Sequence, residues 1–76
     1  MLGGQTVTVG ADPSCALVLV DRTVSRRHAE VRLEKDLVHV RDLASTNGTF
    51  YHNARVKEVS VPLGGEICFG KTRVKV

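Results

Sequence analysis

Hydrophobic and polar residues alternate with a period of two along most of the chain, and no segment shows a helical repeat. Alternation of this kind is typical of β-strands with one buried and one exposed face. Turn-forming residues interrupt it at intervals of about 8–12 residues, a spacing typical of β-sandwiches. The predicted strands are Gln5–Val9, Ala16–Val20, His28–Leu33, Leu37–Arg41, Phe50–Tyr51, Arg55–Val56, Val59–Val61, Glu66–Phe69 and Arg73–Val76. The pattern predicts an all-β fold, a small β-sandwich of antiparallel strands, with a small barrel as the alternative.

Several individual segments of the chain allow more specific predictions. Ala16–Val20 is apolar throughout, which predicts a strand buried on both faces. Glu34–Asp36 separates two alternating runs and is expected to be the turn of a hairpin. Asp21–Arg27 is polar and basic, and Ser45–Gly48 is the strongest turn signal in the chain.

Composition limits the size and class of the protein. The 76 residues are enough for one small domain, spanning residues 1–76, and 42% of them are hydrophobic. Because Phe50, Tyr51 and Phe69 are the only aromatic residues, the core is expected to be built mainly from valine and other aliphatic side chains. The formal net charge of +3 is a mild basic bias that suits an anionic partner without identifying one.

The two cysteines and the lack of long apolar runs bear on location. Cys15 and Cys68 are far apart and flanked by apolar residues, so we expect two buried, reduced thiols. Met1–Val9 lacks the charged start and apolar run of a signal peptide, and no stretch approaches the roughly 20 apolar residues of a membrane span. We therefore expect a soluble, cytoplasmic protein.

Two loops carry more polar groups than a turn requires. The first, Thr23–His28, combines hydroxyl groups with arginines; the second, Ser45–Thr49, combines hydroxyl groups, a side-chain amide and a glycine. Arginine pairs bidentately with phosphate oxygens, and hydroxyl groups fill the remaining acceptor sites. An asparagine amide both donates to and accepts from a peptide backbone, which suits an extended ligand. The two loops together favour a phosphate-bearing peptide as the ligand.

The order of these motifs resembles the forkhead-associated (FHA) domain family. That family carries a Gly-Arg, a Ser-x-x-His and an Asn-Gly motif in this order, then Leu-x-x-Gly-Asp-x-x-x-Gly. The residues that carry the match are Gly10, Ser25-Arg26-Arg27-His28, Asp42-Leu43, Ser45-Thr46-Asn47-Gly48-Thr49 and Leu63-Gly64-Gly65-Glu66-x-x-x-Gly70. The match runs from about Val7 to the C-terminus, and the ordered set is far more specific than any single motif.

The resemblance implies a β-sandwich whose loops, at one end, bind phosphothreonine peptides without a cofactor or metal. It implies that Ser25 and Thr46 donate hydroxyl hydrogen bonds to the phosphate and that Asn47 holds the ligand backbone. By the same resemblance, Arg26 stands where the family often has a phosphate-contacting Lys, Arg or Asn, and Arg27 is a further candidate contact. The residues implied to support the site structurally are Gly10, His28, Gly48 and Thr49. The implied partner is a phosphothreonine-containing protein or peptide, with this domain as part of a larger protein in signalling or complex assembly.

The chain departs from the family pattern at three places. Ala11 stands where the Gly-Arg motif has its arginine, and loss of that charged hydrogen bond, roughly 1.5–3 kcal/mol, is expected to weaken binding unless Arg22 or Arg27 compensates. Asn53 replaces a turn glycine and is expected to adopt the left-handed conformation. Since only Met1–Gln5 precede the strand at Val7, either the sandwich lacks the family's first strand or this chain is a piece of a longer protein.

Three other functions compete with phosphopeptide recognition. Ala11 motivates a phosphate-independent assembly module that keeps the FHA fold. An enzyme or metal site is disfavoured because His28, His39 and His52 form no closely spaced ligand pair and no catalytic triad or nucleotide loop is evident. Nucleic acid is disfavoured because no base-stacking aromatic residues accompany the basic ones. A membrane partner is not expected either.

Overall fold

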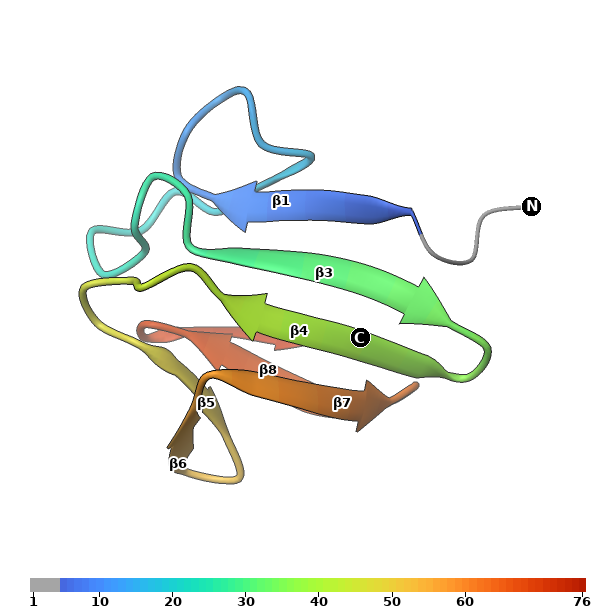
Figure 1. The fold of residues 1–76 in the computed structure, drawn as a ribbon. Coiled ribbons are helices and arrows are strands. Elements are labelled where there is room, and N and C mark those ends of the chain that lie inside the picture. The colour runs from blue at the N-terminus through green and yellow to red at the C-terminus, as the bar shows by residue number, and fades with distance from the viewer. Residues whose placement is uncertain (1–4) are drawn as a thin grey trace.

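The computed structural model describes residues 5–76, which form nine strands and no helix (Figure 1). The strands are β1 (Thr6–Gly10), β2 (Leu17–Val18), β3 (Ala29–Glu34), β4 (Leu37–Asp42), β5 (Thr49–Tyr51), β6 (Ala54–Val56), β7 (Glu58–Pro62), β8 (Glu66–Phe69) and β9 (Thr72–Lys75). Each predicted strand is present, and most bounds agree to within about one residue of the prediction. In the described part of the chain, no helix is long and apolar enough to cross a membrane.

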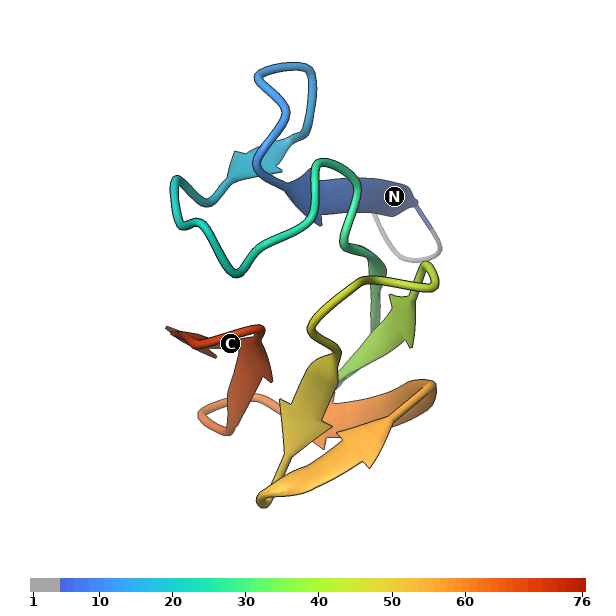
Figure 2. The same cartoon turned by 90° about the vertical axis from the view of Figure 1, so that its left-hand side faces the viewer.

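The strands form two separate sheets, which confirms the predicted sandwich rather than the barrel. One sheet has five strands in the order β2-β1-β3-β4-β7, and the other has four in the order β6-β5-β8-β9 (Figures 1 and 2). All neighbouring strands pair antiparallel except β1 and β2, which pair parallel. The chain crosses from the first sheet to the second after β4 and after β7, so the loop between β4 and β5 joins the layers.

The core lies between the sheets and is built mainly from valine, as predicted. Along β4, Val38 and Val40 are buried whereas Leu37 and Arg41 are exposed, which is the alternation that the sequence shows. From the opposite sheet, Ile67 and Phe69 supply the largest buried apolar side chains. The other buried members of the core are Val9, Val24, Ala29 and Val61.

The prediction for Ala16–Val20 was wrong in one respect. Only two of its residues form a strand, and Leu17, Val18 and Val20 are 41%, 38% and 94% exposed rather than buried. β2 lies at the edge of its sheet and pairs with β1 alone, and the exposure of both its side chains shows that neither of its faces is fully covered. An apolar run reports hydrophobicity, but it does not report how many neighbours the strand will have.

The two cysteines are unpaired, and they differ in burial. Cys15 is buried as predicted, but Cys68 is partly exposed. Cys68 lies between Ile67 and Phe69 on β8, and because those two side chains point into the core, its own side chain points outward. The predicted absence of the family's first strand concerns the segment before Gln5, which lies outside the described residues.

Two hairpins turn through left-handed residues. The β3–β4 turn has Lys35 at φ 53°, within the predicted Glu34–Asp36 turn. The β5–β6 turn has His52 at φ 53° and Asn53 at φ 65°, which confirms the left-handed conformation expected of Asn53. Both residues of the β5–β6 turn are exposed, so the substitution of asparagine for glycine leaves this turn intact.

Four loops gather at one end of the sandwich, which Figure 2 views end-on. They connect β1 to β2, β2 to β3, β4 to β5 and β8 to β9. Backbone hydrogen bonds tie them together: Ala11 N donates to Ser25 O (3.0 Å), and Gly70 N donates to Gly48 O (2.8 Å). Residues that are far apart in sequence are therefore fixed side by side at this end.

The shape of the β4–β5 loop depends on Asp42, at the end of β4. Its Oδ1 accepts hydrogen bonds from Ser45 Oγ (2.6 Å) and Thr49 Oγ1 (2.7 Å), and its Oδ2 accepts one from Ser45 N (3.0 Å). Ser45 Oγ in turn accepts from Gly48 N (3.0 Å), and Gly48 has φ 91°. Burial raises the pKa of the Asp42 carboxyl, but the hydrogen bonds from Ser45 and Thr49 outweigh it and hold the pKa below its ordinary value.

This network makes Asp42 a source of acid sensitivity. Because the pKa of Asp42 is lower in the folded than in the unfolded protein, its stabilisation is complete above the unfolded pKa, near pH 4, and is lost as the pH falls through the folded pKa. We expect Asp42→Asn to lower the free energy of unfolding by about 1–3 kcal/mol at pH 7. Its amide nitrogen would face the Ser45 N–H instead of accepting from it. Urea unfolding at a series of pH values would measure both effects.

The matched control is Asp36→Asn, which removes a carboxylate from the exposed β3–β4 turn. The loss of stability below about pH 4 should be smaller in Asp42→Asn than in the wild type, and unchanged in Asp36→Asn. Equal acid sensitivity in all three proteins would show that the Asp42 network does not stabilise the fold.

Candidate functional site

The first wall of the candidate site is the turn at Ser25–Arg26, which lies against the end of β1. Asp12 N and Cys15 Sγ both donate to Arg26 O, at 3.1 Å and 3.3 Å. A Cβ at Gly10 would come within 2.1 Å of Arg26 O, so only glycine allows this approach. Val24 belongs to the segment Asp21–Arg27, which the sequence shows as polar and basic. Its side chain is nevertheless only 6% exposed and anchors the loop in the core.

Ser25 and Thr46, from different loops, are joined directly. Thr46 N donates to Ser25 Oγ at 3.1 Å, which uses a lone pair of the hydroxyl oxygen and leaves its proton to be donated elsewhere. Ser25 is partly exposed and Thr46 is exposed, so both hydroxyl groups can reach a ligand. The structure brings together Ser25 and Thr46, two hydroxyl-bearing residues that lie 21 residues apart in the sequence.

His28 lies beneath this pair and is completely buried. Its Nδ1 accepts from Ser25 N at 3.0 Å, and its Nε2 lies 2.8 Å from Gly48 O. Because Nδ1 accepts the Ser25 N–H and Nε2 faces a carbonyl oxygen, the ring is the neutral tautomer that carries its proton on Nε2. The ring packs edge-on against Phe69, with centroids 5.6 Å apart. His28 therefore links the β2–β3 loop to the β4–β5 loop and touches no solvent.

Asn47 connects a third loop through Thr23. Its Nδ2 donates to Thr23 O at 2.9 Å, while Lys71 N donates to Thr23 Oγ1 at 2.8 Å. Thr23 Oγ1 donates to Asp21 Oδ1 at 2.6 Å, and the hydrogen bonds from Thr23 hold the pKa of Asp21 below its ordinary value. Thr23 is thus a structural residue, whereas the sequence presented it only as one more hydroxyl group.

Arg26 has a partner that was not predicted from the sequence. Its Nη2 lies 3.2 Å from Asp12 Oδ2, although the Arg26 side chain is 85% exposed. The other oxygen of Asp12 accepts from Ser14 N and Ser14 Oγ, both at 2.8 Å, and these two bonds are the main cause of the lowered pKa of Asp12. Asp12 therefore stays ionised and places a negative charge beside the cation that is predicted to meet the phosphate.

The remaining residues predicted from the sequence differ in their contacts. Arg27 is exposed in the same turn as Arg26, and Arg22 is exposed in the same loop; neither forms a hydrogen bond or ion pair within residues 5–76. Ala11 is half-buried and packs against the core. Thr49 is buried and donates to Asp42, so it shapes the loop and does not face solvent.

The histidines and acidic residues form no metal centre in the described residues, where no group of three potential ligands lies together. His39 points away from the core, with Nδ1 3.3 Å from Ser60 Oγ and Nε2 3.8 Å from Glu58 Oε2. What the loop end offers is a set of hydroxyl groups, the exposed arginines of the β2–β3 loop and the Asn47 amide.

Known proteins are similar to this chain in both sequence and fold. Residues 7–70 match the family model of the FHA domain. The FHA domain-containing protein FhaB of Mycolicibacterium smegmatis is 40% identical over 76 residues, which is 99% of this chain and 49% of FhaB. The chain thus spans about half the length of this relative.

Two solved structures agree with that match. The FHA domain of FhaA, in complex with the intracellular domain of another protein, has a TM-score of 0.83 and 34% identity, covering 96% of this chain and 80% of that one. A structure from work on phosphothreonine-dependent FHA domain interactions has a TM-score of 0.82 and 34% identity, covering 96% of this chain and 74% of that one. The family model spans residues 7–70 and the folds agree, so the chain belongs to the FHA domain family.

Proposed function

We propose that this chain is a phosphopeptide-binding module that recognises phosphothreonine in a protein partner. The observation that carries the proposal is the junction of Ser25 and Thr46 above the buried His28. Because His28 holds both loops in place, Ser25 and Thr46 are held side by side before a ligand arrives, and less conformational entropy is lost on binding. The phosphothreonine-dependent interactions described for a structurally similar FHA domain support the same reading.

Each predicted contact has a distinct part in this proposal. The Ser25 hydroxyl, already oriented by Thr46 N, donates its proton to a phosphate oxygen, and the Thr46 hydroxyl donates to another. Arg26 supplies positive charge, with exposed Arg27 nearby. Asn47 uses one amide proton on Thr23 O, which leaves its second proton and its carbonyl oxygen for the ligand backbone.

Residues 1–76 are proposed to form a single FHA domain that has no catalytic activity of its own. The domain is proposed to be part of a larger protein that acts in signalling or complex assembly. Support comes from the length of FhaB, of which the matching part is 49%. A cytoplasmic location is proposed as well, since Cys15 and Cys68 are unpaired, which suits a reducing compartment.

A phosphate-independent assembly module is the second candidate, and Ala11 is the observation that favours it. In this structure the residue packs against the core and places no charge in the site. With the family's arginine absent, Arg26 is the arginine held at the loop junction, and Asp12 already pairs with it. The two candidates differ in a single measurable property, the dependence of binding on the phosphate.

Calorimetric titration with a degenerate phosphothreonine peptide pool, and with the same pool dephosphorylated, separates the candidates. The phosphorylated pool should bind, and Ser25→Ala/Asn47→Ala should weaken this binding by about 100-fold, since each substitution removes a hydrogen bond worth roughly 1.5 kcal/mol. Ser60→Ala, which removes an exposed hydroxyl group from β7, is the matched control and should bind as the wild type does. Equal binding of both pools would favour the assembly module instead.

Removal of the Asp12 charge is expected to strengthen phosphopeptide binding. Asp12→Asn should bind the phosphopeptide about 3- to 10-fold more tightly, because it removes a charge that competes for Arg26 and repels the phosphate. The asparagine Oδ1 still accepts from Ser14, so the loop is expected to keep its shape. The gain should shrink as salt is added.

Asp36→Asn is the control for the change in net charge, because it removes the same charge from the turn at the opposite end of the sandwich (Figure 1). Its affinity should equal that of the wild type. An equal gain in both variants would mean that net charge, and not the Asp12–Arg26 pair, limits the affinity.

A further inference from the structure

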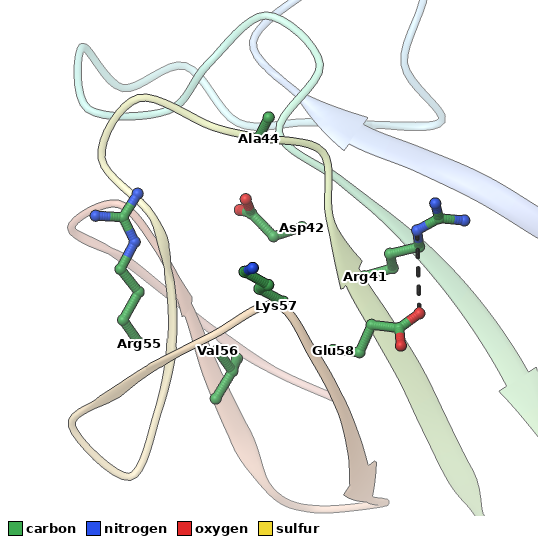
Figure 3. A pocket seen from close by; sticks show the side chains of 7 residues that line it. All are labelled: Arg41, Asp42, Ala44, Arg55, Val56, Lys57 and Glu58. Carbon is green, nitrogen blue, oxygen red and sulfur yellow. Dashed lines mark ion pairs between the residues drawn. The ribbon is translucent and has the colours of Figure 1, made fainter.

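A hollow of about 750 Å³ lies beside the loop that carries Thr46 and Asn47, but it contains neither of them (Figure 3). One wall is the end of β4 with the residue at the start of the loop, namely Arg41, Asp42 and Ala44. The other wall comes from β6 and the start of β7. None of the predicted phosphopeptide contacts lines it, so it is a second concave surface next to the proposed phosphate site.

After its ion pairs are taken into account, this hollow carries an excess of positive charge. The Asp42 carboxylate is only 11% exposed, and it already accepts hydrogen bonds from Ser45 and Thr49. Glu58 lies 4.0 Å from Arg41 Nε, as the dashed line in Figure 3 marks. Arg55 and Lys57 thus remain as exposed cations that have no carboxylate within ion-pair distance among residues 5–76.

Arg55 also touches the loop that carries the proposed contacts. Its Nη2 lies 3.4 Å from Ser45 O, and a Cβ at Gly48 would come within 2.7 Å of its Nε. The guanidinium therefore lies against the residues on either side of Thr46 and Asn47. In an extended peptide each residue spans about 3.5 Å, so a ligand held at Thr46 and Asn47 places a neighbouring side chain within reach of this hollow.

We propose that the hollow is a subsite for an acidic side chain, aspartate or glutamate, of the same phosphopeptide. This inference rests on the proposed phosphothreonine site, which anchors the ligand beside it. Arg55 offers a planar fork of donors and Lys57 a mobile point charge, the pairing that suits a carboxylate. A neutral residue at the same place in the ligand leaves both cations solvated and contributes nothing to selectivity.

The test measures the affinity of phosphothreonine peptides that carry one aspartate at successive positions on either side of the phosphothreonine. At one position, aspartate should bind about 3- to 10-fold more tightly than alanine. Arg55→Gln/Lys57→Gln should remove this preference and leave the affinity for the all-alanine peptide unchanged. Arg73→Gln/Lys75→Gln on β9, outside the hollow, loses the same charge and should keep the preference.

A second variant keeps Arg55, so that the packing of this side chain against Gly48 is undisturbed. Lys57→Glu leaves Arg55 in place and should shift the preference at that position from aspartate to lysine. Persistence of the aspartate preference in both Lys57 variants, or its absence from the wild type, would overturn the subsite while leaving phosphothreonine binding established. If the wild type bound no phosphopeptide at all, the subsite and the proposed function would both be overturned.

Discussion

The buried ring of His28 joins two loops that are far apart in the sequence, and the arrangement at this end of the sandwich depends on it. One nitrogen accepts from Ser25 N and the other bonds Gly48 O, so each loop is fixed relative to the other through a group that has no contact with water. Replacing the ring would leave the Ser25 N–H without its acceptor, at a cost of about 1–3 kcal/mol, whereas Gly48 O would keep the hydrogen bond from Gly70 N. The histidine acts through position, and its chemistry is that of a neutral hydrogen-bonding bridge.

The same principle holds around that bridge, where buried or half-buried groups position exposed ones. Asp42 shapes the β4–β5 loop from below through Ser45 and Thr49, and Thr23 ties Asn47 to the β8–β9 loop. The exposed groups that result are hydroxyls, an amide and arginine, which are the donors that a phosphate and its peptide require. Asp12 opposes this by pairing with Arg26, so the affinity of the site is set by a balance of charges as well as by geometry.

Alternation along the chain was enough to predict the strands, because an inward valine followed by an outward polar residue is a local property of each strand. The edge position of β2 was not predictable in this way, since exposure of Leu17 and Val18 depends on which strands lie beside them. The meeting of Ser25 with Thr46 was anticipated only through the order of the family motifs. The Asp12–Arg26 pair and the hollow at Arg55 had no signal in the sequence, because both depend on how loops fold against each other.

Binding of phosphothreonine at the loop end is tested by recording the backbone amide NMR spectrum while the protein is titrated with a phosphothreonine peptide and, separately, with its unphosphorylated counterpart. Only the phosphorylated peptide should move signals, and the largest shifts should fall on Ser25, Arg26, Thr46 and Asn47. Signals at the opposite end, such as that of Lys35, should stay in place. Shifts that are equal for both peptides, or that centre on the outer face of a sheet, would show that the loop end is not a phosphothreonine site.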